Sequence, residues 1–171
     1  EVQTETKEQQ IEEIFNNAFT NLKNLNKTNV KEYIDYDALV SSVDKMIIED
    51  NNNDDTLEKE LFENLEWQID DIFNDENKAI VKVKTSNIDF KNIVTTWMKS
   101  VVSEKSKGTN ISNEFVLNKL QEAVEKENEI RTVTKEITLI KKDENWIFSV
   151  DTNLRNAVFT GIEIINTALT K

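Results

Sequence analysis

Apolar residues in the first 26 positions recur every three or four residues, which predicts an amphipathic helix. Residues 1–9 ahead of this stripe are polar and are expected to fray as a tether. A second helix is predicted to begin at Asn29, an N-cap three residues before Glu32, and to run to Ile47. Whether it is one piece or breaks at Asp35–Asp37 is left open. A short helix capped by Asp55 or Thr56 follows, through Phe62.

Two segments change to a period of two, which is typical of half-buried strands. Residues 65–88 alternate on both sides of a polar turn at 74–77, and this pattern predicts a β-hairpin. Residues 130–140 and 146–150 alternate on both sides of a second polar turn, Asp143-Glu144-Asn145. The sequence therefore predicts four strands in two hairpins.

Three further helices are expected around the second hairpin. Asp89 is a natural N-cap for a helix with an unbroken apolar stripe from Phe90 to Val102, and Gly108 is its predicted C′ residue. Another helix covers residues 115–124. The last begins at Asp151 or Thr152 and extends to Leu169. Gly161 inside it costs about 1 kcal/mol relative to Ala, so a kink or close packing is expected there.

The order of elements indicates an α+β protein with one domain over residues 1–171. Each helical stripe must be covered, and isolated hairpins are unstable in water. A curved four-stranded antiparallel sheet wrapped by N-terminal, central and C-terminal helices meets both demands.

The composition removes several kinds of chemistry. The chain has no His, no Cys and no Pro, and only two Gly. Without His and Cys there is no Ser-His-Asp or Cys-His nucleophile, no conventional zinc site and no disulfide. No cofactor is expected.

The charge bears on partners. The chain has 21 Lys and Arg and 33 Asp and Glu, so its net charge is −12. A chain this acidic does not neutralise phosphates, and neither nucleic acid nor an anionic membrane is an expected partner. The alternative is a surface that imitates nucleic acid with its carboxylates. No apolar run is long enough to span a membrane.

Residues 49–56 contain clustered oxygen ligands of the kind that Ca²⁺ prefers. The spacing departs from the EF-hand loop, because the sixth position lacks Gly whether the count starts at Glu49 or at Asp50. We interpret the segment as a solvated loop, and no metal site is expected.

Two stretches carry a resemblance to a known family. AIVKVKTSNIDFKNIVTTWMKSVV is a strand leading through Asp89 into a helix. EITLIKKDENWIFSVDTNLRNAV is a strand, a charged turn, a Trp-containing strand and a capped helix. Together they resemble secreted or lipid-anchored proteins of Gram-positive bacteria that have the cystatin-like fold of nuclear transport factor two and its relatives. The resemblance covers roughly residues 10–160 and is strongest over 78–160.

The resemblance implies a cone-shaped domain with a pocket closed by the first helices. It also implies export to the cell envelope or the extracellular space, with a lipid-anchoring Cys upstream of Glu1. Domains of this fold include isomerases, dehydratases and binding modules, so the fold does not select a function.

One cluster has enzyme-like chemistry, namely Tyr33, Asp35, Tyr36 and Asp37. An Asp base and a Tyr donor would suit a carbonyl isomerase. The two tyrosines lie three residues apart, which predicts neighbours on one helix face, whereas such a site draws its groups from opposing walls. Dehydratases of this fold commonly use His, which is absent. No catalytic residue is assigned, and Tyr33, Tyr36 and Asp35 are kept as ligand-binding candidates.

Trp67, Trp97 and Trp146 could line an apolar pocket, but their positions within apolar stripes favour a core role. Trp97 is kept as a fourth ligand-binding candidate.

Two functions from different classes follow from these observations. The favoured one is a non-catalytic exported envelope domain that binds a protein partner or a small ligand. The alternative is a small-molecule enzyme of the isomerase or dehydratase kind, with its pocket inside the cone. A deep polar pocket would favour the enzyme, and a pocket filled by Trp and Phe side chains would favour the binding module.

Overall fold

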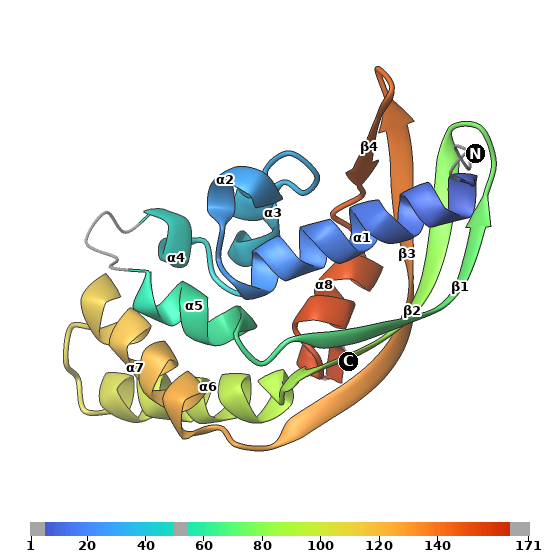
Figure 1. The fold of residues 1–171 in the computed structure, drawn as a ribbon. Helices are drawn as coiled ribbons and strands as arrows, with labels where there is room; N and C mark the ends of the chain where they lie inside the picture. The colour runs from blue at the N-terminus through green and yellow to red at the C-terminus, as the bar shows by residue number, and fades with distance from the viewer. Residues whose placement is uncertain (1–5, 50–54, 165–171) are drawn as a thin grey trace.

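The computed structural model describes residues 6–49 and 55–164 of the chain. Its centre is a four-stranded antiparallel sheet (Figure 1) of β1 (Glu66–Asn74), β2 (Lys78–Ile88), β3 (Ile130–Lys142) and β4 (Asn145–Phe148). The strands lie in the order in which they occur in the chain. The two predicted hairpins are confirmed, and the long pairing of β2 with β3 joins them. The α+β class predicted from the sequence is therefore confirmed.

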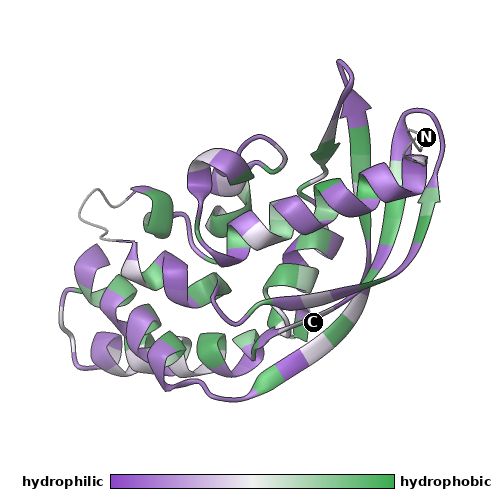
Figure 2. Ribbon diagram, viewed as in Figure 1, coloured by the Kyte–Doolittle hydropathy of each residue, from purple (hydrophilic) through white to green (hydrophobic). Residues whose placement is uncertain are grey.

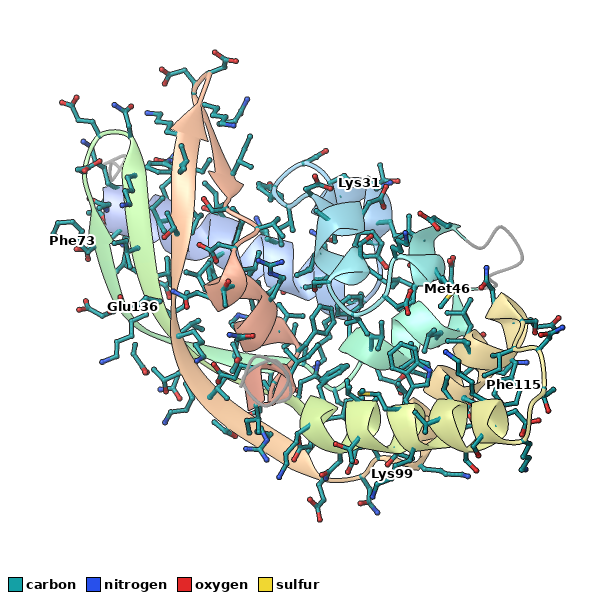
Figure 3. All side chains as sticks on the ribbon, turned by 180° about the vertical axis from the view of Figure 1, so that it is seen from behind. Lys31, Met46, Phe73, Lys99, Phe115 and Glu136 are labelled. Carbon is teal, nitrogen blue, oxygen red and sulfur yellow. The ribbon has the colours of Figure 1, made fainter. Side chains whose placement is uncertain are left out.

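The two faces of the sheet differ in what covers them. On β2, Ala79, Val81 and Val83 are buried, while Lys82 and Lys84 between them are exposed. The helices pack on the first face, and the second face is open to solvent. Figure 3 shows Phe73 and Glu136 on this open face. The alternation of apolar and polar residues that predicted the strands thus arises because helices cover only one face of the sheet.

Helices α1 (Lys7–Lys23) and α8 (Thr152–Val158) lie against the covered face (Figure 1). The space between α1 and the strands is filled by aromatic rings. The ring centroid of Phe15 lies 4.3 Å from that of Phe19 and 5.3 Å from that of Phe148. All three side chains are buried. The inner side of the curved sheet is therefore packed solid at this point.

The first helix differs from its predicted limits. Thr6 is its N-cap and forms a reciprocal capping box with Gln9, so residues 7–9 are helical and do not fray. The predicted tether overlaps the helix at residues 7–9, and residues 1–5 lie outside the described part of the chain. The helix ends at Lys23, and Leu25 adopts a positive φ of 55°.

Three short helices occupy the region 29–47, for which the sequence left open one helix or a break at Asp35–Asp37. They are α2 (Lys27–Val30), α3 (Tyr36–Ser41) and α4 (Met46–Glu49). The predicted cap at Asn29 is wrong, because Asn26 caps α2 and accepts a hydrogen bond from the Asn29 N–H. Asp35 caps α3, so the chain breaks at the acidic stretch. Residues 50–54, which hold most of the rejected calcium loop, lie outside the described part.

A second group of helices forms the end of the molecule away from the β3–β4 turn (Figure 1). It comprises α5 (Thr56–Phe62), α6 (Phe90–Ser106) and α7 (Asn113–Lys126). Asp89 caps α6 as predicted, and Gly108 beyond its end has a φ of 76°. The unbroken stripe on α6 is only half confirmed, because Met98 and Val102 are exposed. The second half of α6 projects beyond the sheet, so its stripe meets only part of a core.

The C-terminal helix is shorter than predicted. Asp151 caps α8, which ends at Val158, and Gly161 follows it with a φ of 93° instead of lying inside an uninterrupted helix. The expected close packing is present. A Cβ added at Gly161 would meet Asp89 Oδ1 at 2.7 Å and Arg131 Cδ at 2.8 Å. The predicted apolar positions Ile165 and Leu169 lie outside the described residues.

Candidate functional site

The structure separates the two tyrosines that the sequence placed on one helix face. Tyr33 lies in the turn between α2 and α3, and Tyr36 is the first residue of α3. Tyr36 is buried, while Tyr33 is half-buried. The prediction of a shared helix face is wrong because α2 ends at Val30.

Tyr36 belongs to a closed polar network. Its hydroxyl donates to the carboxylate of Glu58, which is 2% exposed although it lies on a surface helix, α5. Burial raises the pKa of Tyr36 above its usual range, and the hydrogen bond to Glu58 raises it further. A phenol in this state stays protonated and has already given its proton to an internal acceptor. It cannot act as a base and has no proton to offer a ligand.

Lys27 completes this network. Its ammonium lies 2.8 Å from Glu58 Oε2 and 2.7 Å from Asp55 Oδ1, and it stands 5.7 Å above the Tyr36 ring. Burial opposes the charge on Lys27, but the hydrogen bonds to Asp55 and Glu58 outweigh that cost and raise its pKa. The buried carboxylate is thus compensated within the protein. We assign the network a structural role.

Tyr33, in contrast, lies beside a hollow at the edge of the sheet. The Tyr33 carbonyl accepts a hydrogen bond of 2.8 Å from the N–H of Phe148 on β4. This bond fixes the α2–α3 turn against the last strand. Asp35 also lines the hollow, although its carboxylate is engaged as the α3 cap through the Ala38 N–H at 3.1 Å.

The hollow has two contiguous parts that share Glu32, Tyr33 and Ile147. The larger has a volume of about 640 Å³ and lies between α1 and the β3–β4 hairpin; the smaller has a volume of about 350 Å³ and follows residues 31–37. Tyr33, Trp146 and Ile147 are among the residues that form the walls. We call these two parts together the hairpin groove, and its lining residues are Gln10, Ile14, Lys31, Glu32, Tyr33, Ile34, Asp35, Tyr36, Asp37, Lys142, Asp143, Glu144, Asn145, Trp146 and Ile147.

The hairpin groove is acidic. Its lining holds five exposed carboxylates and two exposed ammonium groups. Lys31 is 4.0 Å from Asp37, and Glu144 is 3.4 Å from Lys141. The carboxylates of Glu32 and Asp143 form no ion pair with any other described residue. Figure 2 shows that the tip of the β3–β4 hairpin, where Asp143 and Glu144 lie, is hydrophilic. The groove therefore offers uncompensated negative charge beside apolar walls.

The tip of the hairpin has an unusual backbone. Asp143 has a φ of 49° and Glu144 a φ of 67°, so both central residues of this two-residue turn adopt left-handed conformations. Turns of this kind favour Asn-Gly, because Gly reaches positive φ without steric cost. Two carboxylates occupy positions here where other residues would be more stable.

The tryptophans are divided among three places. Trp97 lies on α6 and donates its ring N–H to the Val116 carbonyl at 2.9 Å, which ties α6 to α7. It is half-buried and not among the residues that line the hairpin groove, so it does not meet the other three candidates. Trp67 packs edge-on to Phe19 at 5.6 Å and is half-buried. Trp146 is 7% exposed and lines the groove.

Sequence reasoning missed Glu32, Asp143 and Glu144 as groove residues. The turn was recognised as charged, but its neighbours in space come from residues 10–37, more than a hundred positions away. No local pattern reports such a contact. Among the described residues, no group of three or more acidic, His or Cys side chains is arranged to hold a metal ion. In the same part of the chain, no helix is both long and apolar enough to cross a membrane.

Comparison with known proteins gives one match. No protein-family model matches the chain, and no curated protein matches it. The chain is similar to a solved structure from Bacillus subtilis, described as "a putative lipoprotein (ycdA)", at 21% sequence identity and a TM-score of 0.37. The match covers 58% of this chain and 34% of that one, so it spans about a third of the other protein's length.

Proposed function

We propose that this protein is a non-catalytic binding domain and that its partner or ligand binds in the hairpin groove. The observation that carries the proposal is that aromatic side chains fill the inner side of the sheet, while an open groove lies at its edge. The inner side of the curved sheet is filled by Phe15, Phe19 and Phe148. The hairpin groove lies outside this packing, at the edge of β4. A shallow acidic groove with aromatic walls is suited to recognition of a partner.

The same observation weighs against the enzyme alternative. An isomerase or dehydratase of this kind needs polar groups converging in an enclosed pocket that excludes water. The buried tyrosine has its proton engaged by Glu58, and the Asp35 carboxylate is engaged by the backbone of α3. The Tyr36 phenol is therefore unavailable to a substrate, and Asp35 uses one carboxylate oxygen as the α3 cap and does not lie in an enclosed pocket. These side chains serve the fold.

The cystatin-like fold and the envelope location are part of this proposal. They rest on the resemblance of residues 79–102 and 136–158 to exported Gram-positive proteins. The strand–helix junction at Asp89 and the capped helix at Asp151, which carry that resemblance, are both formed. A protein of net charge −12 is also suited to a partner of opposite charge rather than to nucleic acid.

The first experiment is a native mass spectrum of gently purified protein. An adduct of defined mass would give the class of ligand, and a clean mass would favour a protein partner. Backbone amide NMR shifts on addition of the adduct compound, or of a cell-envelope extract, would then locate the site. Shifts at Tyr33 and Ile147 are expected. Shifts confined to the α6–α7 end, or an envelope fraction without the native protein, would contradict the proposal.

A further inference from the structure

We propose that the occupant of the hairpin groove is an extended, basic segment of a protein partner, which adds to the free edge of β4. This inference rests on the proposed binding function and names the class of partner. Three observations carry it: the direction of the backbone groups of Trp146, the way Tyr33 already uses the same edge, and the charge of the groove.

The hydrogen-bond pattern of β4 leaves one residue of its outer edge free. In an antiparallel pair, every second residue points its N–H and C=O away from the neighbouring strand. The Phe148 N–H points away from β3, to Tyr33, and Ser149 N–H bonds to Thr138 on β3. Trp146 lies two residues before Phe148, so its N–H and C=O also point away from β3. No described residue accepts from the Trp146 N–H.

The partner of Trp146 across the sheet confirms this geometry. Lys141 is the residue opposite Trp146 on β3, and its N–H bonds to the Asn77 carbonyl on the far side. Lys141 and Trp146 therefore form a pair without mutual hydrogen bonds. The polar backbone groups of Trp146 are left facing the hairpin groove, which Trp146 lines. Groups of this kind are rarely left unpaired in a residue that is 7% exposed.

The chain itself shows how the edge is used. Tyr33 places its carbonyl against β4 as an added strand would, at a distance of 2.8 Å from the Phe148 nitrogen. An incoming segment would continue this pairing by two residues and exchange hydrogen bonds with Trp146. Addition of an extended peptide to a sheet edge is a common mode of recognition. An enclosed small molecule needs no strand edge, so the edge favours a polypeptide.

The negative charge of the groove favours a basic polypeptide. Glu32 and Asp143 both line the larger hollow, the first from the segment between α2 and α3 and the second from the hairpin tip, and they have no ion-pair partner among the described residues. Lys141 shows the arrangement a cation can adopt here, with its ammonium 3.4 Å from Glu144 and 6.0 Å from the Trp146 ring. Lys or Arg side chains of a bound segment would meet carboxylates and aromatic faces together.

The other edge of the sheet is protected against such pairing. β1 carries a bulge between Ile69 and Asp71 that interrupts its register with β2. Bulges and charges on an edge strand disfavour pairing with another chain. No such irregularity interrupts the pairing of β4 with β3. The two edges thus predict one docking position.

The test uses synthetic peptides and the labelled full chain. The probe is a peptide of about nine residues, a common strand length, in which Lys alternates with Thr and Val. The first control replaces each Lys with Glu. The second keeps the Lys residues but methylates alternate backbone nitrogens, which removes the donors needed for strand pairing. Binding is followed by the amide NMR shifts of Trp146 and Tyr33 and by titration calorimetry.

The basic peptide is expected to bind and to shift the Trp146 amide. Backbone methylation is expected to weaken binding about tenfold, since one or two hydrogen bonds are lost. The Glu peptide is expected to show no binding. If the methylated peptide binds equally well, or if the shifts fall on β1 or the open face, strand addition at β4 is wrong. If no peptide binds while an adduct still shifts Tyr33 and Ile147, the polypeptide is wrong and the binding function stands.

A matched pair of variants tests the charge. Glu32→Gln with Asp143→Asn removes the two unpaired groove carboxylates and is expected to weaken binding of the basic peptide about tenfold at low salt. Glu114→Gln with Glu125→Gln removes the same charge from α7, at the other end of the molecule (Figure 1). Equal weakening by both pairs would show a general charge effect and would overturn the proposed groove contact.

Discussion

The two ends of β3 differ in whether the polar groups around them have hydrogen-bond or ion-pair partners within the protein. At the end near Arg131, which we call the closed end, the buried polar side chains have partners inside the protein. At the β3–β4 turn, which we call the open end, the Asp143 carboxylate and the Trp146 N–H have none among the described residues. The first end contains buried Asn87, Asp89 and Thr160, and the second contains exposed Asp143 and Glu144. Buried polar groups that bond to one another stabilise the fold, whereas the groups at the open end face solvent and are the ones to which we propose that a partner binds.

The closed end is built from side chains that bond to backbone. Asn87 donates to the Leu61 and Val158 carbonyls at 2.9 and 3.0 Å, and Thr160 donates to the carbonyls of Asn87 and Ile88. Asp89 caps α6 and also accepts from Arg131 Nε at 3.0 Å. The hydrogen bond to Asp89 is the main reason that the pKa of Arg131 is raised. Gly161 fits between these groups.

The largest effect is expected from Gly161→Ala at the closed end. The new Cβ would lie 2.7 Å from Asp89 Oδ1, and the φ of 93° is unfavourable for Ala. Strain and the clash together are expected to cost about 3 kcal/mol of unfolding free energy. Gly108→Ala is the matched control, because Gly108 has a φ of 76° and nothing within 4 Å of the new atom. It should cost about 1 kcal/mol. Urea unfolding measures the free energy of unfolding of both variants. Equal losses would show that the closed end can accommodate a Cβ at residue 161 without a clash.

The next effect is expected from Asn87→Ala. The change removes both donors that satisfy the Leu61 and Val158 carbonyls and the acceptor of the Ile88 N–H. Leaving these buried groups unpaired is expected to cost about 2–3 kcal/mol. Asn145→Ala at the exposed end of β4 serves as its counterpart and should change stability by less than about 0.5 kcal/mol. If urea unfolding gives a comparable loss of stability for both variants, the polar groups of the closed end do not contribute more to stability than those of the open end.

A third test compares the two tyrosines. The pKa of Tyr36 is raised in the folded protein, so the unfolded chain loses its Tyr36 proton first as the pH rises. The stability from this group is complete below about pH 10, the usual pKa of Tyr, and is lost above it at up to about 1.4 kcal/mol per pH unit. Tyr36→Phe should reduce this alkaline loss. Thermal unfolding between pH 9 and 11, with Tyr33→Phe as the control, measures it. The same loss in Tyr36→Phe and the parent protein would show that the pKa of Tyr36 is not raised in solution by burial and by the hydrogen bond to Glu58.

The smallest effect on stability is expected from Glu144→Gly at the open end, and this variant should be more stable than the parent protein, not less. Gly accepts the φ of 67° that strains Glu144, so the variant is expected to be about 0.5–1 kcal/mol more stable. Asp143→Asn with Glu144→Gly creates the turn sequence favoured by two-residue hairpins. If the basic peptide binds this variant more weakly while its melting temperature rises, the turn trades stability for binding. A lower melting temperature would contradict the strain at this turn.

Sequence patterns predicted the elements whose periodicity is regular. The strands follow from strict alternation at Ala79, Val81 and Val83, and the caps Asp89 and Asp151 from residue type. In the region 26–49 the sequence offered one break, at Asp35–Asp37, whereas the structure has more, because Asn26 and Asp35 cap short helices there and Asp44 accepts from the Met46 N–H just before the third. An apolar period near 3.6 continues across those breaks, so periodicity alone joins them.

The candidate site was less predictable than the fold. Of the four candidates, Tyr33, Asp35 and Tyr36 line the hairpin groove and Trp97 does not. The buried state of Glu58 depends on Tyr36, 22 positions away, and on Lys27. The groove depends on the hairpin turn meeting residues 10–37. The burial of Glu58 and the groove both depend on contacts between distant segments, and such contacts leave no periodic pattern in a single sequence.

The α6 and α7 helices lie in the connection between β2 and β3, so the central strand pair has to close a long loop. Ile88 and Ile130 are paired partners, so residues 89–129 form a loop closed by the central strand pair. The two hairpins need only short loops and can form early. Joining them costs about 3 kcal/mol of chain entropy for a loop of this length. We therefore expect assembly of the central pair to be the slow step of folding.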